Sequence, residues 1–359
     1  MSRAEIFVPT PKNKNQTIRA AGLMFESTYL FLDHLAPFCA LLGWPLIIVD
    51  PQVRELAEQY YPGLEIIETS MPKLQSTLQS FTHLATCASR PLLLASIGPI
   101  PCKTIWLPHG NSDKGRIFPF FDVLRDENLA LIYGQKMADF LKDERVDPPV
   151  IRIGQYRYLY YQKWREFYDD LPIAAFSQKQ PTVLYAPTWE DSENNCSFWK
   201  AFPTLAKHLP DSFNLIVKLH PNTVVKNAPE IERLIGKYQN GRLQFLLDFP
   251  PIFALLNRCD YYLGDRSSIG YDFLRFDRPL FFLDPHDHQA GRELTSCGTV
   301  VSPENFHISL MQKDNFSAER RRMNAYTFDN ISLADLQRSI RNFCIDSGCR
   351  QDKNCLQIH

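Results

Sequence analysis

The chain has 359 residues, of which 39 are basic and 40 are acidic, so its formal net charge at pH 7 is -1. A balance this even argues against a protein that binds nucleic acid with its whole surface. With 45% hydrophobic and 22% charged residues, the composition is typical of globular proteins, and the length is enough for two ordinary domains.

Export and membrane spanning are not indicated. No apolar run reaches the roughly 18 residues that cross a bilayer, and short runs such as Leu92–Ile97 and Leu280–Leu283 are typical of buried strands. The N-terminal residues lack the apolar core of a signal peptide. The nine cysteines form no CxxC pair and have no zinc-site spacing. These features predict a cytoplasmic protein with reduced thiols.

Short β-rich runs alternate with amphipathic stretches along the whole chain, which predicts βαβ units and parallel sheets. Helical patterns cover Glu26–Leu42 and Val53–Tyr60. The expected strands of the first half are Glu5–Val8, Pro45–Val49, Leu64–Glu68, His83–Ala85, Thr104–Leu107, Leu129–Tyr133 and Val150–Ile153.

The pattern restarts in the second half. Its expected strands are Thr182–Tyr185, Asn214–Leu219, Leu243–Leu247, Asp260–Leu263, Leu280–Leu283 and Thr299–Val301. We therefore expect an α/β protein with two doubly wound, Rossmann-like domains that face each other across a cleft. The predicted boundaries are a first domain over 1–165, a linker over 166–181, a second domain over 182–330, and a closing helix (Leu333–Phe343) with a frayed tail over 331–359.

His109 and Gly110 follow the expected strand Thr104–Leu107 after a single proline, Pro108. A histidine at a strand end titrates near neutral pH and is suited to act as a general base. Gly110 allows a sharp turn or a close approach to a ligand. The alternative is a histidine that only hydrogen-bonds a turn.

Thr188 and Trp189 follow the first strand of the second domain, where nucleotide-binding domains place their first ligand-binding turn. Thr188 offers a hydroxyl, and Trp189 offers an aromatic face on which a base could stack. Packing of Trp189 in the core is the alternative.

Lys218 and His220 fall on the same side of the strand Asn214–Leu219. A cation beside an imidazole at a strand end suits a phosphate-bearing substrate. The alternative is a surface lysine next to a structural histidine.

A fourth segment runs from an apolar strand into Asp265, Arg266, Ser267 and Ser268, and the two serines open an expected helix. Serine hydroxyls, free backbone N–H groups and the positive end of the helix dipole together form an anion site, well suited to a diphosphate. An ordinary helix cap needs only one serine, so the pair favours a functional site.

Together these four segments resemble the CDP-glycerol glycerophosphotransferases, the family of the teichoic-acid primases and polymerases. The resemblance runs from about His109 to Pro285 and keeps the family's motif order. The matching elements are His109-Gly110 with Lys114 (HG-x-x-x-K), Tyr185–Trp189 (YAPTW), Lys218–Pro221 (the second histidine motif), and Asp265, Ser267, Ser268 and Asp272-Phe273 (D-x-SS-x-x-x-DF), with Arg278-Pro279 beyond.

The resemblance implies a GT-B architecture with an acceptor-side first domain and a nucleotide-donor second domain. It implies that His109 is the general base for attack of an acceptor hydroxyl on CDP-glycerol, with release of CMP. The implied donor contacts are His220, Ser267 and Ser268 for the developing charge, Lys218 or Arg266 for the phosphates, and Thr188, Trp189 and Asp265 for the nucleotide. Gly110, Lys114 and Asp272 are implied to support the site, with no cofactor and no essential metal.

Acceptors in this family are lipid-linked, which implies peripheral contact with the inner face of the membrane. The aromatic run Gly115–Phe121 either touches a bilayer or lines the cleft, and packing inside the protein is the interpretation that such runs favour. Two departures from the family stand out: Glu190 replaces an arginine after YAPTW, and Asn111–Asp113 replaces a more apolar trio.

Two rival hypotheses remain open at the level of sequence. A nucleotide-sugar glycosyltransferase or epimerase would use the same cleft, because fold does not fix function. A non-catalytic nucleotide-binding protein is the other, and the joint presence of His109, Lys218, His220, Ser267 and Ser268 argues against it. The acceptor, the alcohol of the donor and the oligomeric state are left open.

Overall fold

The chain folds around two parallel sheets. The computed structural model describes residues 18–26, 29–113, 121–190, 195–283 and 294–349. The first sheet contains β1 (Ala20–Met24), β2 (Leu46–Ile48), β3 (Ile66–Glu68), β4 (His83–Thr86), β5 (Lys103–Trp106), β6 (Leu129–Ile132) and β7 (Val150–Arg152). The second contains β8 (Thr182–Ala186), β9 (Asn214–Val217), β10 (Leu243–Phe245), β11 (Tyr261–Gly264), β12 (Leu280–Phe282) and β13 (Thr299–Val300).

Both sheets have the same order over six strands, and the first sheet has β7 as an additional edge strand. The strand orders are β3-β2-β1-β4-β5-β6-β7 and β10-β9-β8-β11-β12-β13, and all neighbouring strands are parallel. This is the 3-2-1-4-5-6 order of dinucleotide-binding folds, in which ligands bind where the strand order reverses. The predicted pair of Rossmann-like domains is confirmed.

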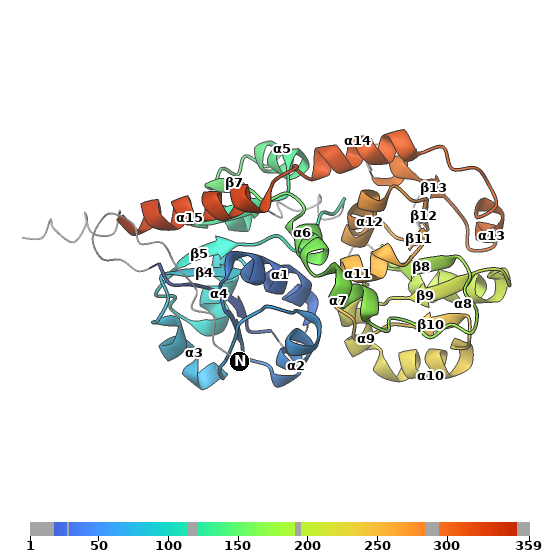
Figure 1. Cartoon of the computed structure of the whole chain (residues 1–359), viewed down its shortest axis with the longest axis horizontal. Helices are drawn as coiled ribbons and strands as arrows, with labels where there is room; N and C mark the ends of the chain where they lie inside the picture. Colours follow the sequence, from blue (N-terminus) through green and yellow to red (C-terminus); the bar gives the residue numbers. More distant parts are fainter. Residues whose placement is uncertain (1–17, 27–28, 114–120, 191–194, 284–293, 350–359) are drawn as a thin grey trace, which may run out of the picture.

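Helices connect the strands and cover the sheets (Figure 1). In the first domain they are η1 (Tyr29–Phe31), α1 (Leu32–Leu42), α2 (Pro51–Tyr60), α3 (Met71–Leu78), α4 (Arg90–Ile97), η2 (Asp122–Leu124) and α5 (Gln135–Asp143), and α6 (Tyr156–Lys163) and α7 (Arg165–Asp170) lead out of it. The second domain has α8 (Phe198–His208), α9 (Pro221–Lys226), α10 (Ala228–Tyr238), α11 (Ile252–Asn257), α12 (Ser268–Phe273), η3 (Leu274–Phe276), η4 (Leu294–Cys297), α13 (Phe306–Ser309) and α14 (Ser317–Thr327), and α15 (Leu333–Cys349) comes after it.

Most expected strands coincide with observed ones, and two predictions were wrong. The run Leu92–Ile97 lies in helix α4, with Leu92 and Leu94 on its exposed side. The first central strand, β1, was missed because its sequence, Ala-Ala-Gly-Leu-Met, has little β propensity. Small residues are needed there, since a Cβ on Gly22 would lie 2.4 Å from Cys39 Sγ. The expected strand Glu5–Val8 lies outside the described residues.

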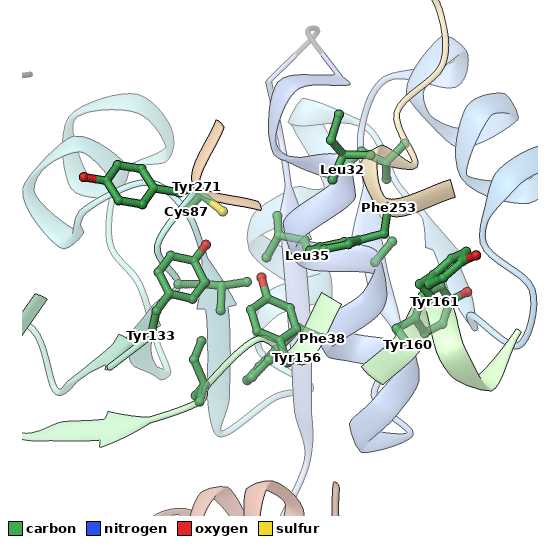
Figure 2. Packing of buried hydrophobic residues seen from close by; sticks show 14 of the residues in the cluster. Leu32, Leu35, Phe38, Cys87, Tyr133, Tyr156, Tyr160, Tyr161, Phe253 and Tyr271 are labelled. Atoms are coloured by element: carbon green, nitrogen blue, oxygen red, sulfur yellow. The ribbon is translucent and has the colours of Figure 1, made fainter. Parts of the chain in front are cut away.

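The largest hydrophobic cluster is continuous between the two domains. It contains α1 and α6 side chains of the first domain together with α11 and α12 side chains of the second. Figure 2 shows Leu32 and Leu35 near Phe253, and Phe38 beside Tyr156. Phe253 also meets Tyr158 of α6 edge to face, with ring centroids 5.5 Å apart. Separate clusters fill the outer faces of each sheet.

The chain crosses between the domains twice. The first crossing is through α6 and α7, which lie between the two sheets in Figure 1. All of α7 except its first residue falls within the range predicted as linker, 166–181. After α14, helix α15 returns to the first domain. His83 Nε2 lies 2.7 Å from Ser347 Oγ, and Gln337 donates to the Leu41 carbonyl at 2.7 Å. The closing helix therefore completes the first domain.

A buried arginine joins the domains. Arg157 of α6 forms ion pairs with Asp33 of α1 at 3.0 Å and with Asp272 of α12 at 2.7 Å. The Arg157 and Asp272 side chains are only 6% and 4% exposed. Burial raises the pKa of Asp33 to about 6, against the opposing effect of Arg157. The cluster has two carboxyls for one guanidinium, which is consistent with this shift.

Replacing this arginine should destabilise the whole protein. Arg157→Met leaves two buried carboxyls without a cation and should lower the free energy of unfolding by about 3–5 kcal/mol in urea titrations at pH 8. The loss should be smaller at pH 5, because carboxyls with raised pKa values can then be protonated. Arg165→Met breaks an exposed pair and should leave the urea midpoint nearly unchanged. Equal losses in both variants would contradict this prediction.

Candidate functional site

A cavity of about 520 Å³ lies between the domains, within the size range of small-molecule sites. It is lined from the first domain by residues that follow β5 and by α1, α5 and α6, and from the second domain by residues that follow β8, β9 and β11. These are carboxyl ends of parallel strands, where doubly wound domains bind ligands.

Most of the predicted site residues meet in this cavity. Those that line it are His109, Gly110, Thr188, Trp189, Lys218, His220, Ser267, Ser268 and Asp272. Asp265 and Arg266 do not line it, and Lys114 lies outside the described residues. The four sequence motifs therefore contribute residues to the same cavity, although the first and last of these residues are more than 150 positions apart in the chain.

His109 stands at the end of β5, with its ring exposed to the cavity. The Tyr133 hydroxyl donates a hydrogen bond to the carbonyl of the preceding residue, Pro108, at 2.8 Å. The Phe31 ring packs against the imidazole, with ring centroids 5.0 Å apart. Within the described part of the chain, no side chain hydrogen-bonds either ring nitrogen. Desolvation by the surrounding protein lowers the pKa of His109 to about 4. The imidazole is therefore neutral at pH 7 and able to accept a proton.

Gly110 brings the two domains into direct contact. Its φ of +124° lies in a region that favours glycine, and a Cβ there would be 2.4 Å from the Ser268 Cβ. The backbone beside His109 therefore lies against the start of α12. Both the conformation and the lack of space exclude a side chain at this position.

His220 is held in one tautomer. As the N-cap of α9, its Nδ1 accepts a hydrogen bond from the Asn222 N–H at 3.2 Å. A neutral ring with an accepting Nδ1 carries its proton on Nε2, so the other nitrogen is a donor. Trp189, 41% exposed, lies nearly parallel to this ring with centroids 6.1 Å apart. The second histidine is thus arranged to donate, whereas His109 is free to accept.

Lys218 lines the same cavity as these two rings. Its Nζ donates to the Phe249 carbonyl at 2.8 Å, and the residue is 7% exposed. Burial lowers the pKa of Lys218 to about 8, and the nearby carboxylates Asp33 and Asp248 only partly oppose that shift. The lysine is still mostly charged at pH 7, and it places a positive charge in the cavity wall.

Ser267 and Ser268 open α12 without capping it. Ser267 is the N-cap residue, but its side chain accepts no hydrogen bond from the first turn as the structure describes it, and its Oγ lies 3.2 Å from the Tyr262 hydroxyl. Ser267 therefore does not cap the helix with its side chain, as an N-cap serine ordinarily does. Helix α12 has only six residues, so the serine hydroxyls and the first-turn N–H groups are more important for binding an anion than the helix dipole.

Asp265 and Arg266 support the site from behind. Asp265 Oδ2 accepts the Thr188 N–H at 2.8 Å and the Ser197 N–H at 3.1 Å. It thereby joins the segments that follow β8 and β11, on either side of the strand-order reversal. Arg266 donates to Asn195 Oδ1 at 3.2 Å and is 5% exposed. Both residues thus make structural contacts behind the cavity lining, and their contact with the donor stays a prediction.

Sequence reasoning missed several residues of the cavity wall. Arg157 and Asp33 line it, and the available signal was a single arginine within the aromatic helix α6. Asn111 also lines it and is 3% exposed, and neither polar atom of its side chain has a hydrogen-bond partner within the described ranges. An aromatic wall completes the side of the first domain: Trp106, Phe121 and Phe140.

Three further expectations concern the surroundings of the site. Glu190 pairs with Lys226 at 3.0 Å and lies outside the cavity lining. Of the run Gly115–Phe121, only Phe121 lies within the described residues. Across the described ranges, no helix is long and apolar enough to cross a membrane, and no group of three or more His, Cys, Asp or Glu side chains has the arrangement of a metal site.

Comparisons with known sequences support the same family. A family model described as CDP-Glycerol:Poly(glycerophosphate) glycerophosphotransferase matches residues 155–293. The teichoic acid glycerol-phosphate primase of Bacillus spizizenii is 26% identical over 208 residues, which cover 53% of this chain. The match spans 52%, or about half, of the length of the primase. The predicted resemblance to this family is confirmed.

Comparisons with solved structures agree on the fold. A variant of the wall teichoic acid polymerase TagF, soaked with CDPG, has a TM-score of 0.60 at 13% identity, over 91% of this chain and 89% of that chain. Anabaena Alr3699/HepE in complex with UDP and glucose has a TM-score of 0.53 at 12% identity, over 91% of this chain and 99% of that chain. The predicted GT-B type architecture is confirmed.

Contact between Gly110 and Ser268 leads to a testable prediction. Gly110→Ala should lower the free energy of unfolding by about 2–4 kcal/mol, because backbone strain and a steric clash add up. Gly43→Ala is the matched control: φ there is +67°, and nothing lies within 4 Å of the added Cβ. It should cost only about 1–2 kcal/mol. Equal losses in urea denaturation would show that the domains do not meet at Gly110.

Proposed function

We propose that this chain transfers a glycerophosphate-type group from a CDP-alcohol, CDP-glycerol first among candidates, to an acceptor hydroxyl and releases CMP. One observation carries the proposal. A neutral His109 from one domain faces Lys218, His220, Ser267 and Ser268 from the other across a single cavity. The combination suits a reaction in which a hydroxyl loses a proton while negative charge develops on a diphosphate.

The reaction begins at the acceptor hydroxyl. His109 takes its proton while the oxygen attacks the β-phosphorus of the CDP-alcohol. The bond from that phosphorus to the oxygen that bridges the two phosphates breaks, and CMP leaves with the electron pair. The acceptor then carries the glycerophosphate group, and the proton passes from His109 to solvent. A neutral imidazole at pH 7 is the form that this first step requires.

Groups of the second domain stabilise the developing charge. The Nε2–H of His220 and the two serine hydroxyls donate to phosphoryl oxygens, and Lys218 contributes a positive charge from the wall. Trp189 offers an exposed ring face for the nucleotide base, and the loop that contains Thr188 is held by Asp265. In this arrangement Asp272 acts through Arg157, which keeps α12 beside the first domain.

The aromatic wall of the first domain and the side-chain amide of Asn111 are suited to the acceptor. Acceptors in the resembled family are lipid-linked. We therefore propose that the chain acts in the cytoplasm, with peripheral contact to the inner face of the membrane during catalysis. Vesicle flotation with and without acceptor lipid would test this part of the proposal separately from turnover.

Donor choice and the role of His109 can be tested together. CDP-glycerol or CDP-ribitol should raise the melting temperature and yield CMP, and His109→Ala should lower that rate by about 10²–10⁴-fold without loss of donor binding. His208→Ala, at an exposed position outside the cavity lining, is the control and should keep full activity. A response to UDP-glucose or UDP-GlcNAc alone would instead indicate a nucleotide-sugar enzyme. No change in melting temperature and no turnover with any nucleotide would indicate a non-catalytic protein.

The pH dependence of kcat/KM should report two groups of the free enzyme. His109 with a pKa of about 4 predicts that activity persists well below pH 6.5 and falls only as the imidazole is protonated. Lys218 with a pKa of about 8 predicts a loss of activity as pH rises through 8 and the cation is neutralised. Lys218→Arg should move the basic limb to higher pH, because arginine remains charged. An acidic limb at 6.5 would contradict the assignment of a desolvated base.

A further inference from the structure

The Asp113 carboxylate receives partners from both domains. From the first domain, Lys136 of α5 places its Nζ 3.1 Å from Asp113 Oδ1. From the second, the Tyr271 hydroxyl donates to the same oxygen at 2.5 Å, and the Leu294 N–H donates to Oδ2 at 3.2 Å. One side chain therefore joins α5, α12 and the start of η4.

This cluster is sealed from solvent. The Lys136 and Asp113 side chains are 0% and 1% exposed, and Tyr271 is fully buried. The ammonium also lies over the Tyr271 ring, 5.1 Å from its centroid. In Figure 2 the Tyr271 hydroxyl points away from the other labelled side chains, out of the hydrophobic cluster. Buried charges of this kind hold their partners in a narrow geometry, because any displacement leaves a charge unsatisfied.

The cluster lies between the two halves of the site. Asp113 is four residues after His109, on the same loop beyond β5. Tyr271 is three residues after Ser268, on the helix that this serine opens. The same loop and helix touch at Gly110 and Ser268. The relative position of the proposed base and the proposed phosphate site is thus set at two points, one a steric contact and the other an ionic cluster.

We propose that Lys136, Asp113 and Tyr271 are positioning residues that fix the His109 loop against the donor helix α12. This inference rests on the proposed function. Asp113 and Tyr271 occupy unspecified positions of the HG-x-x-x-K and D-x-SS-x-x-x-DF elements, and Asp113 belongs to the trio that departs from the family.

The first test removes one hydroxyl. Tyr271→Phe keeps the ring in the core and deletes the bond to Asp113, so the loop can shift relative to α12. Small misplacements of reacting groups cost up to about 10²-fold in rate. We expect kcat for CMP release to fall about 10- to 100-fold, with KM for the donor and Kd for CMP unchanged within about three-fold. Unchanged kcat would overturn the proposal, and so would an equal loss of CMP affinity.

Tyr160→Phe is the matched control. This buried tyrosine donates a hydrogen bond to the Pro62 carbonyl at 2.7 Å, within the first domain and away from the cavity lining. It should lose a similar amount of stability and keep full kcat. If both tyrosine variants lose activity in proportion to their melting temperatures, the cluster serves only stability, and the proposal fails.

A second set of variants separates stability from positioning. Asp113→Leu alone removes the buried carboxylate that pairs with Lys136 and leaves the ammonium in the core, whereas Asp113→Leu with Lys136→Met and Tyr271→Phe makes the cluster apolar. Replacing a complete buried ion pair with hydrophobic residues is often neutral for stability. The triple variant should recover melting temperature relative to Asp113→Leu but not kcat. Joint recovery of both would overturn the positioning role.

Hydrogen exchange provides a readout that does not depend on turnover. In Tyr271→Phe, peptides that cover residues 105–113 and the Leu294 amide should exchange faster than in wild type, and Tyr160→Phe should leave both unchanged. If the wild type releases no CMP from any donor, the proposed function fails while this measurement still tests the interdomain contact. Unaltered exchange in Tyr271→Phe would overturn the inference by itself.

Discussion

The buried guanidinium of Arg157 is the constraint on which the cleft depends. A charge removed from water is stable only with partners, and here the two partners come from different domains. Interfaces between domains are usually polar and mobile. In this chain the charge cluster is embedded in a hydrophobic cluster that runs from α1 to α12, so the domains share one core over part of their boundary. The packing of the two domains against each other therefore determines the shape of the cavity, which is not simply a gap between two independently moving domains.

The two histidines of the cavity differ because their backbones differ. His220 begins a helix, and the Asn222 amide occupies one of its ring nitrogens. His109 follows a strand into a glycine turn, where no described group occupies either nitrogen. Local secondary structure alone therefore gives one imidazole a fixed donor and leaves the other with an available lone pair. Two histidines can therefore provide both a proton acceptor and a hydrogen-bond donor for a reaction that needs both in one cavity.

The sequence predicted the fold and the motif residues because strand ends are local signals. An apolar run followed by a polar cluster marks the same edge of a parallel sheet wherever it occurs, and this placed His109, Lys218 and Ser267 together. Strand β1 escaped prediction because its small residues are selected by the close packing of α1, which is a tertiary property. Helix α4 was mistaken for a strand because its apolar run is short, and periodicity is ambiguous over so few residues.

Contacts between distant segments were beyond the reach of sequence patterns. Nothing in a single sequence pairs Arg157 with Asp272, or Asp113 with Tyr271, since each pair is separated by more than 100 residues. The same limitation explains Asp265. Its place in a shared motif predicted a ligand contact, and the motif gave no sign that its carboxylate also accepts hydrogen bonds from the Thr188 and Ser197 amides of the segment after β8.

The return of α15 to the first domain has a consequence for how the protein is made. His83 and Ser347, which are in contact, lie 264 positions apart, and the chain between them includes the entire second domain. During synthesis, the first sheet leaves the ribosome without helix α15, which contacts β4, β5 and α1. Its final packing must wait until the second domain has been translated, so the N-terminal half should spend that interval as a partly open intermediate that needs protection from aggregation. Long-range closure of this kind also slows folding, because the loop entropy is lost before the contacts form.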